Sequence, residues 1–114
     1  MNGNASDAEP VAARMDLLAQ EAGTWYLLSD GEHIYLDIRT GLLGQGFWLL
    51  LILNESERNG YRAGGLPYIT ALAKTVQLHA RAYFLRNEPI EKQRIVFAAV
   101  EEWLKDPRRH EVQS

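Results

Sequence analysis

The feature that most constrains this chain is an apolar run near its middle. Phe47–Leu53 contains seven consecutive apolar residues, Phe-Trp-Leu-Leu-Leu-Ile-Leu, between Gly46 and Asn54. Burying seven large side chains contributes on the order of 10 to 20 kcal/mol, an upper estimate because an unfolded chain already hides some surface. The run is therefore predicted to be a core strand.

Both faces of this predicted strand are apolar. Successive side chains of a strand point to opposite faces. One face carries Phe47, Leu49, Leu51 and Leu53, and the other carries Trp48, Leu50 and Ile52. Each face needs a covering layer, so we expect helices on one and a second apolar surface, from this chain or another subunit, on the other.

The rest of the chain is predicted to form one domain around this strand. Its 114 residues suffice for a single core. We expect a disordered tail over 1–9, a single α+β domain over 10–107 and a polar tail over 108–114. The absence of cysteine fits a reducing compartment. The N-terminus lacks a secretory signal pattern, and the apolar segment 42–53 is short of the ~20 residues of a membrane span, so a cytoplasmic location without membrane contact is expected.

The segment before the core strand predicts one helix and two strands. From Pro10, apolar residues at helical spacing continue to Ala22, and Gly23 follows as a stop. The turn Asp30-Gly31 then separates two strands, 25–28 and 33–39, as expected of a hairpin. In the second strand apolar residues alternate with polar or aromatic ones, which predicts a half-buried strand. With the core strand, these form a three-stranded antiparallel meander.

The segment after the core strand is predicted to be helical. Asn54 is a suitable cap for a helix beginning at Glu55. Gly64-Gly65 should break or kink it before a main helix over 67–86. A last helix follows Pro89 and ends near Leu104. The predicted fold class is thus α+β: a three-stranded antiparallel meander sheet, an N-terminal helix, and two or three C-terminal helices packed on the sheet.

Short motifs over residues 24–85 carry a resemblance to a known group. They are Trp25-Tyr26-Leu27-Leu28, Asp30-Gly31, Tyr35-Leu36, Leu53-Asn54-Glu55 and Gly60-Tyr61-Arg62-Ala63-Gly64-Gly65, with Tyr68 and Leu72. This series resembles small uncharacterised bacterial α+β proteins that share a strand-strand-strand-helix order. Some of those proteins look like immunity or accessory proteins of contact-dependent systems. The motifs form a fold rather than a catalytic centre, so the resemblance implies an architecture and a protein partner but no activity.

Two arginines are the strongest charged candidates for a binding site. Arg58 and Arg62 lie four residues apart, on one face of the predicted helix, beside Gly64-Gly65. Two guanidinium groups near free backbone amides can hold an anion or the carboxylates of a partner. The alternative is that both are solvated and paired with Glu55 and Glu57.

No catalytic motif or cofactor fingerprint is present in the sequence, and none is predicted. His79 falls on the apolar stripe of the main helix, where a buried, hydrogen-bonded histidine fits better than a catalytic base. An acid–base pair with Asp37 or Glu88 would require the fold to bring them together. No two histidines have helical metal-site spacing, so metal binding is not expected.

The aromatic residues favour protein contacts. If all the C-terminal helices cover the Leu49 face, then Trp48, Leu50 and Ile52 remain uncovered, and a homodimer would bury them. The alternative is that the N-terminal helix covers that face within one chain.

Two classes of function follow from these patterns. The leading hypothesis is a non-enzymatic protein–protein interaction module, accessory or immunity-like, with Arg58 and Arg62 on its surface. The second is a small-molecule-binding or enzymatic domain. Its pocket would lie between sheet and helices, lined by Tyr35, Trp48, Tyr68 and His79. A net charge of −3 disfavours nucleic acid as a partner.

Overall fold

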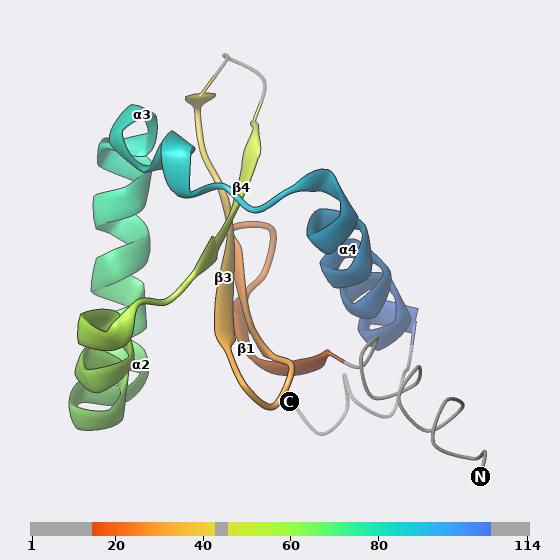
Figure 1. Cartoon of the computed structure of the whole chain (residues 1–114), viewed down its shortest axis with the longest axis horizontal. Coiled ribbons are helices and arrows are strands. Elements are labelled where there is room, and N and C mark those ends of the chain that lie inside the picture. The colour runs from red at the N-terminus through yellow and green to blue at the C-terminus, as the bar shows by residue number, and fades with distance from the viewer. Residues whose placement is uncertain (1–14, 43–45, 106–114) are drawn as a thin grey trace, which may run out of the picture.

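The computed structural model describes residues 15–42 and 46–105 of the chain. It is an α+β fold with a four-stranded antiparallel sheet (Figure 1). The strands lie side by side in chain order: β1 (Asp16–Glu21), β2 (Trp25–Ser29), β3 (Ile34–Arg39) and β4 (Trp48–Ile52). The helical elements are α2 (Glu55–Leu78), α3 (Ala80–Tyr83), the 3-10 helix η2 (Phe84–Arg86) and α4 (Ile90–Lys105).

The three predicted strands are confirmed, but the predicted N-terminal helix is wrong. Asp16–Glu21, inside the expected helix, is strand β1 and pairs antiparallel with β2. Gly23 lies in the turn between these strands with a positive φ of 73°, so it belongs to a hairpin turn and does not end a helix. Pairing with β2 outweighs the thin helical stripe because it gives the backbone of β1 its partners and lets Leu17 pack on the core.

The sheet has a core on each face, and one helix covers each (Figure 1). On one face α2 contributes Ile69, Ala73 and Val76 to a cluster with Leu36, Leu49 and Leu51. On the other face α4 contributes Val96 and Val100 to a cluster with Leu28, Tyr35 and Leu50. The expectation that the helices share one face of the sheet is therefore wrong, and β3 is buried on both sides for most of its length.

Helix α2 begins and bends as its sequence predicts. Asn54 Oδ1 accepts from the Glu57 N–H at 2.8 Å, and Glu57 Oε1 accepts from the Asn54 N–H at 2.9 Å, which is a capping box. Gly65 interrupts the helix with φ 66° and ψ −150°, so the predicted kink is confirmed. Near this bend the Tyr68 ring lies where a Cβ on Gly60 would be, so the close approach requires glycine.

The connection between the two helical layers crosses the free edge of β4 (Figure 1). Leu50 N–H donates to Asn87 Oδ1 at 2.8 Å, and Leu50 O accepts from the Glu88 N–H at 2.8 Å. Arg86 donates to Ile52 O at 2.9 Å. These bonds satisfy an edge that would otherwise expose polar groups, and they carry the chain to the face where α4 packs.

Some predictions concern residues outside 15–42 and 46–105, namely the tails 1–9 and 108–114, the helix start at Pro10 and the stop at Asp106-Pro107. Within the part of the chain that the structure describes, no helix combines the length and hydropathy needed to cross a membrane.

Candidate ligand-binding site

A groove of about 540 Å³ lies between α4 and one end of the sheet. This volume is in the range of small-molecule sites, which are typically ~300 to 1,000 Å³. The sheet contributes Tyr26, Asp37 and Trp48, and α4 contributes Ile90, Gln93, Arg94, Phe97, Val100, Glu101 and Leu104. We call this cavity the α4 groove.

The strand register brings the three sheet residues together. Tyr26 of β2 pairs directly with Asp37 of β3, and Asp37 pairs with Leu50 of β4. Paired residues of neighbouring strands point to the same face, so Asp37 lies between Tyr26 and Leu50 under α4. The rings of Tyr26 and Trp48, from the strands on either side of β3, stack with centroids 5.8 Å apart. These side chains form the floor of the groove.

Asp37 is the most perturbed group of this floor. Burial among apolar neighbours raises the pKa of its carboxyl from 3.8 to about 7, because the charged form loses its hydration. Among the residues that the structure describes, none donates a hydrogen bond to it or forms an ion pair with it. Arg94 and Glu101 line the same groove without pairing with it.

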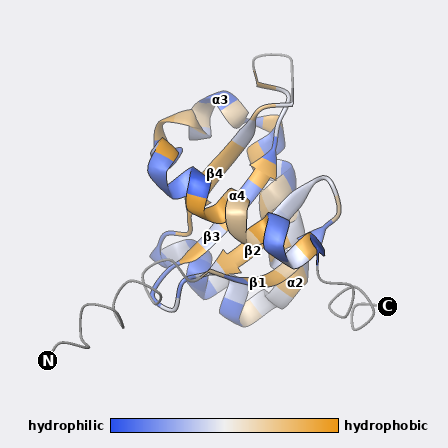
Figure 2. Ribbon diagram, turned by 90° about the vertical axis from the view of Figure 1, so that its right-hand side faces the viewer, coloured by the Kyte–Doolittle hydropathy of each residue, from blue (hydrophilic) through white to orange (hydrophobic). Residues whose placement is uncertain are grey.

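The helical wall comes from one face of α4. Residues 90, 93, 94, 97, 100, 101 and 104 recur at three- and four-residue intervals, so they lie along one stripe. Ile90 and Phe97 remain 55% and 63% exposed, which leaves the groove open to solvent along this wall. Figure 2, with α4 in front of the sheet, shows apolar and polar residues alternating along the helix. The groove thus offers apolar walls and a few polar groups, the composition typical of ligand sites.

The four side chains expected to line one pocket do not converge. Trp48 lies in the floor of the α4 groove. Tyr35 lies deeper under α4, 1% exposed, and its hydroxyl donates to Asp30 Oδ2 at 2.9 Å. Tyr68 packs against the core on the α2 side of the sheet.

His79 lies at the C-terminal end of α2 and is exposed, so the expectation of a buried histidine is wrong. The helix ends there, with the His79 N–H bonded to Thr75 O, before the apolar stripe can carry the side chain into the core. The face of the sheet that carries Asp37 is the one opposite α2, so the structure does not form an acid–base pair between Asp37 and His79.

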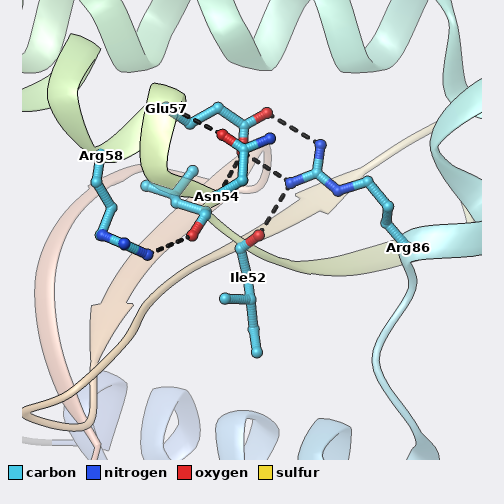
Figure 3. Close-up of polar contacts among 6 residues, drawn as sticks. Ile52, Asn54, Glu57, Arg58 and Arg86 are labelled. Carbon is cyan, nitrogen blue, oxygen red and sulfur yellow. Dashed lines mark hydrogen bonds and ion pairs between the residues drawn. The ribbon is translucent and has the colours of Figure 1, made fainter.

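The two arginines are tied to neighbouring groups of their own segment. Arg58 donates to Leu53 O at 3.0 Å, and Arg62 donates to Asn59 Oδ1 at 2.6 Å. Glu57 pairs instead with Arg86, whose guanidinium approaches Glu57 Oε1 to 2.7 Å (Figure 3). The expected pairing of Arg58 and Arg62 with Glu57 is therefore not formed, and Arg58 is held at the end of β4 by its bond to Leu53 O.

No group of three or more acidic or histidine side chains is arranged to hold a metal ion among residues 15–42 and 46–105.

The carboxyl of Asp30 stabilises a turn. Burial raises its pKa, but the N–H groups of His33 and Glu32 donate to it and bring the pKa down to about 2. These hydrogen bonds to Asp30 stabilise the hairpin. Asp37, by contrast, is a strongly perturbed carboxyl that faces a cavity.

Sequence reasoning missed Tyr26, Asp37, Arg94 and Phe97 as parts of one site. One signal was present: aspartate is depleted in strand interiors, yet Asp37 stands between Leu36 and Ile38 in a strand. The others look like ordinary surface or core residues until α4 is known to cover this face.

Comparison of the chain with family models, with curated proteins and with solved structures finds no match. The resemblance to small bacterial proteins and the immunity-like role therefore stay predictions.

Proposed function

We propose that this chain is a small-molecule-binding domain whose ligand occupies the α4 groove. The single observation that carries the proposal is the Asp37 carboxyl, which faces this cavity with no partner among the described residues. A carboxyl in an apolar site costs stability unless something pairs with it. Perturbed, unpaired groups in clefts cluster at functional sites, where a ligand supplies the missing contact.

The shape of the groove supports the same proposal. Its floor is the stacked pair Tyr26 and Trp48, and its wall includes the exposed ring of Phe97. Aromatic surfaces bind flat or apolar groups with large contact area. The groove also accommodates an enzymatic variant of this function, since a carboxyl with a pKa near 7 suits general acid–base catalysis.

The test is a protein-observed NMR screen of the full chain against aromatic and aliphatic fragments with neutral, cationic and anionic heads. We expect the shifted resonances to cluster at Tyr26, Asp37, Trp48 and the groove face of α4. The variant Phe97→Ala removes an apolar wall at an exposed position and should weaken fragment binding about tenfold, since it deletes one aromatic contact.

Phe84→Ala is the matched control, because Phe84 is also largely exposed, at 45%, but packs against Phe47 outside the groove. It should leave binding unchanged. Equal losses in both variants, or no fragment that perturbs the groove, would show that the α4 groove is not a ligand site.

A second candidate is self-association, the leading expectation from the sequence in its homodimeric form. The sequence-based expectation of an uncovered Trp48 face is wrong because α4 covers that face. The exposed side chains of Ile90 and Phe97, on the stripe of α4 that lines the groove, favour self-association independently. A second copy docked there would cover both side chains and close the groove.

A further inference from the structure

We infer that the ligand of the α4 groove is an organic cation, a protonated amine joined to an aromatic or aliphatic body. This inference rests on the proposed binding function and names its ligand class. It follows from three features of the groove: an unpaired acceptor, aromatic rings in the lining and the balance of charge.

The acceptor is Asp37, which can receive hydrogen bonds from a ligand and has no donor among the described residues. Its neighbours in the sheet row are Tyr26 and Leu50, and neither brings a positive charge. An ammonium group placed here would supply both a charge and several N–H donors to a carboxyl that has lost much of its hydration, where such contacts are strong.

The π faces belong to Tyr26 and Trp48. A cation is attracted to the face of an aromatic ring, and Trp is the best such partner. This chain already uses the contact elsewhere: Lys92 Nζ lies 5.4 Å from the Tyr35 ring centroid, and Arg86 Cζ lies 5.6 Å from that of Tyr83. Within the described residues no such cation lies over Tyr26 or Trp48, so this stacked pair is available to a ligand.

The charges around the groove also favour a cation. The titratable or charged groups that line the groove are Asp37 from β3, Tyr26 from β2, and Arg94 and Glu101 from α4. The residue from β4, Trp48, carries no charge. With both carboxyls ionised the acidic groups outnumber the basic one, and the acid at the floor is the one shielded from water. An anionic head would face that carboxylate, whereas Ile90 and Phe97 would cover the apolar body in either case.

The experiment compares three ligands that share a phenyl body: phenethylamine, the neutral 3-phenylpropionamide and the anionic 3-phenylpropionate. Each is titrated into the full chain at pH 8, with affinity measured by chemical-shift changes of the groove residues. We expect phenethylamine to bind at least tenfold more tightly than the amide, and the carboxylate to bind most weakly.

Asp37→Asn keeps the shape of the side chain and removes its charge. It should lower phenethylamine affinity about tenfold and leave amide affinity within twofold. Glu91→Gln removes an exposed acid from α4 outside the groove and should change neither. A melting curve of each variant shows whether it is folded.

Wild-type chain offers a test that needs no substitution. Because burial raises the pKa of Asp37 to about 7, its ionised fraction falls about tenfold between pH 8 and pH 6, while a primary amine stays protonated. Phenethylamine affinity should fall by about the same factor, and amide affinity should not.

The outcomes separate this inference from the proposed function. If the amide or carboxylate binds the groove as tightly as the amine, the ligand class is wrong and the binding function stands. If none of the three perturbs the groove, the inference is overturned, and the wider fragment screen then decides the binding function. If the amine binds without dependence on Asp37 or pH, the assigned acceptor is wrong.

Discussion

At the scale of single residues, the ionised carboxyl of Asp37 lowers the stability of the fold, although the same carboxyl is the proposed ligand acceptor. The folded chain raises its pKa from 3.8 to about 7, so the native state holds a proton that the unfolded chain would release. Well below pH 3.8 the carboxyl is protonated in both states and has no effect on stability. As pH rises from about 4 to about 7 the cost to the folded state grows, and it is largest above pH 7.

The variant Asp37→Asn tests this cost. A pKa difference of about 3 units at ~1.4 kcal/mol per unit sets an upper bound of about 4 kcal/mol. We therefore expect the variant to be more stable than wild type by about 1 to 4 kcal/mol at pH 8, with little difference at pH 4. Urea unfolding at the two pH values measures it.

Asp30→Asn is the control of opposite sign. Although burial raises the pKa of Asp30, the donated hydrogen bonds bring it down to about 2, below its ordinary 3.8. Its stabilising effect is thus present above pH 4 and lost as pH falls toward 2, so this variant should be less stable at pH 8. A stability loss for Asp37→Asn at pH 8 would contradict the unpaired, buried carboxyl.

At the scale of elements, the link between Glu57 and Arg86 holds the start of α2 to the crossing segment. Arg86 donates to both carboxyl oxygens of Glu57, at 2.7 and 3.0 Å, and to Ile52 O at 2.9 Å (Figure 3). One guanidinium therefore joins the capping box of α2, the end of β4 and η2. Because the next residues lead into α4, this link also sets where the wall of the groove lies.

The variant Arg86→Met tests that link while keeping an apolar stem. It leaves the partly buried Glu57 and Ile52 O without their donor, so we expect a loss of about 2 to 3 kcal/mol in the free energy of unfolding at pH 7. Arg81→Met, at an exposed position on α3, should change stability by less than about 0.5 kcal/mol. Denaturant unfolding compares the two.

The same variant has a defined pH dependence. Burial raises the pKa of Glu57, but the hydrogen bonds from Arg86 and the Asn54 N–H, together with the charge of Arg86, outweigh burial, so the net pKa lies below the ordinary value of 4.5. This stabilisation is present above pH 4.5 and is lost as pH falls through the lower native value. The difference between Arg86→Met and wild type should therefore shrink at pH 3; a constant difference would mean that Arg86 acts through packing.

At the scale of the whole molecule, the sheet and its two helical layers leave apolar side chains of α4 exposed along the wall of the groove. Phe97 is 63% exposed there, and Leu85, on the connection before α4, is 93% exposed. If two copies associate through α4, Phe97→Asp should convert the dimer to a monomer, whereas Leu85→Asp should not.

Sedimentation velocity of the full chain over a range of concentrations makes this comparison. A stable pair should bury at least ~1,000 Å² in total, an area that a single aspartate at the centre of the contact disrupts. A wild-type chain that stays monomeric throughout would rule out the homodimer and leave the groove open for a small ligand.

Much of the architecture was predictable because its signals are local. The hairpin turn at Asp30-Gly31, the cap at Asn54 and the kink at Gly65 each depend on a few neighbouring residues. β1 was not predictable in this way, since its apolar residues fit a helix about as well as a strand and the choice depends on pairing with β2. The site was less predictable still: of the residues predicted to bind, the groove includes Trp48 alone.

By itself the sequence determined that both faces of Phe47–Leu53 would be covered, and that the fold would combine an antiparallel sheet with helices. Hydrophobic periodicity and turn chemistry specify these features because both act within short segments. Only the tertiary structure decided that the connection before α4 crosses the edge of β4 and places α4 on the far face of the sheet. That crossing leaves Asp37 half-buried beside Tyr26 and Trp48. The pKa of a carboxyl depends on what surrounds it in space, and here part of the surroundings comes from α4, more than fifty residues away along the chain.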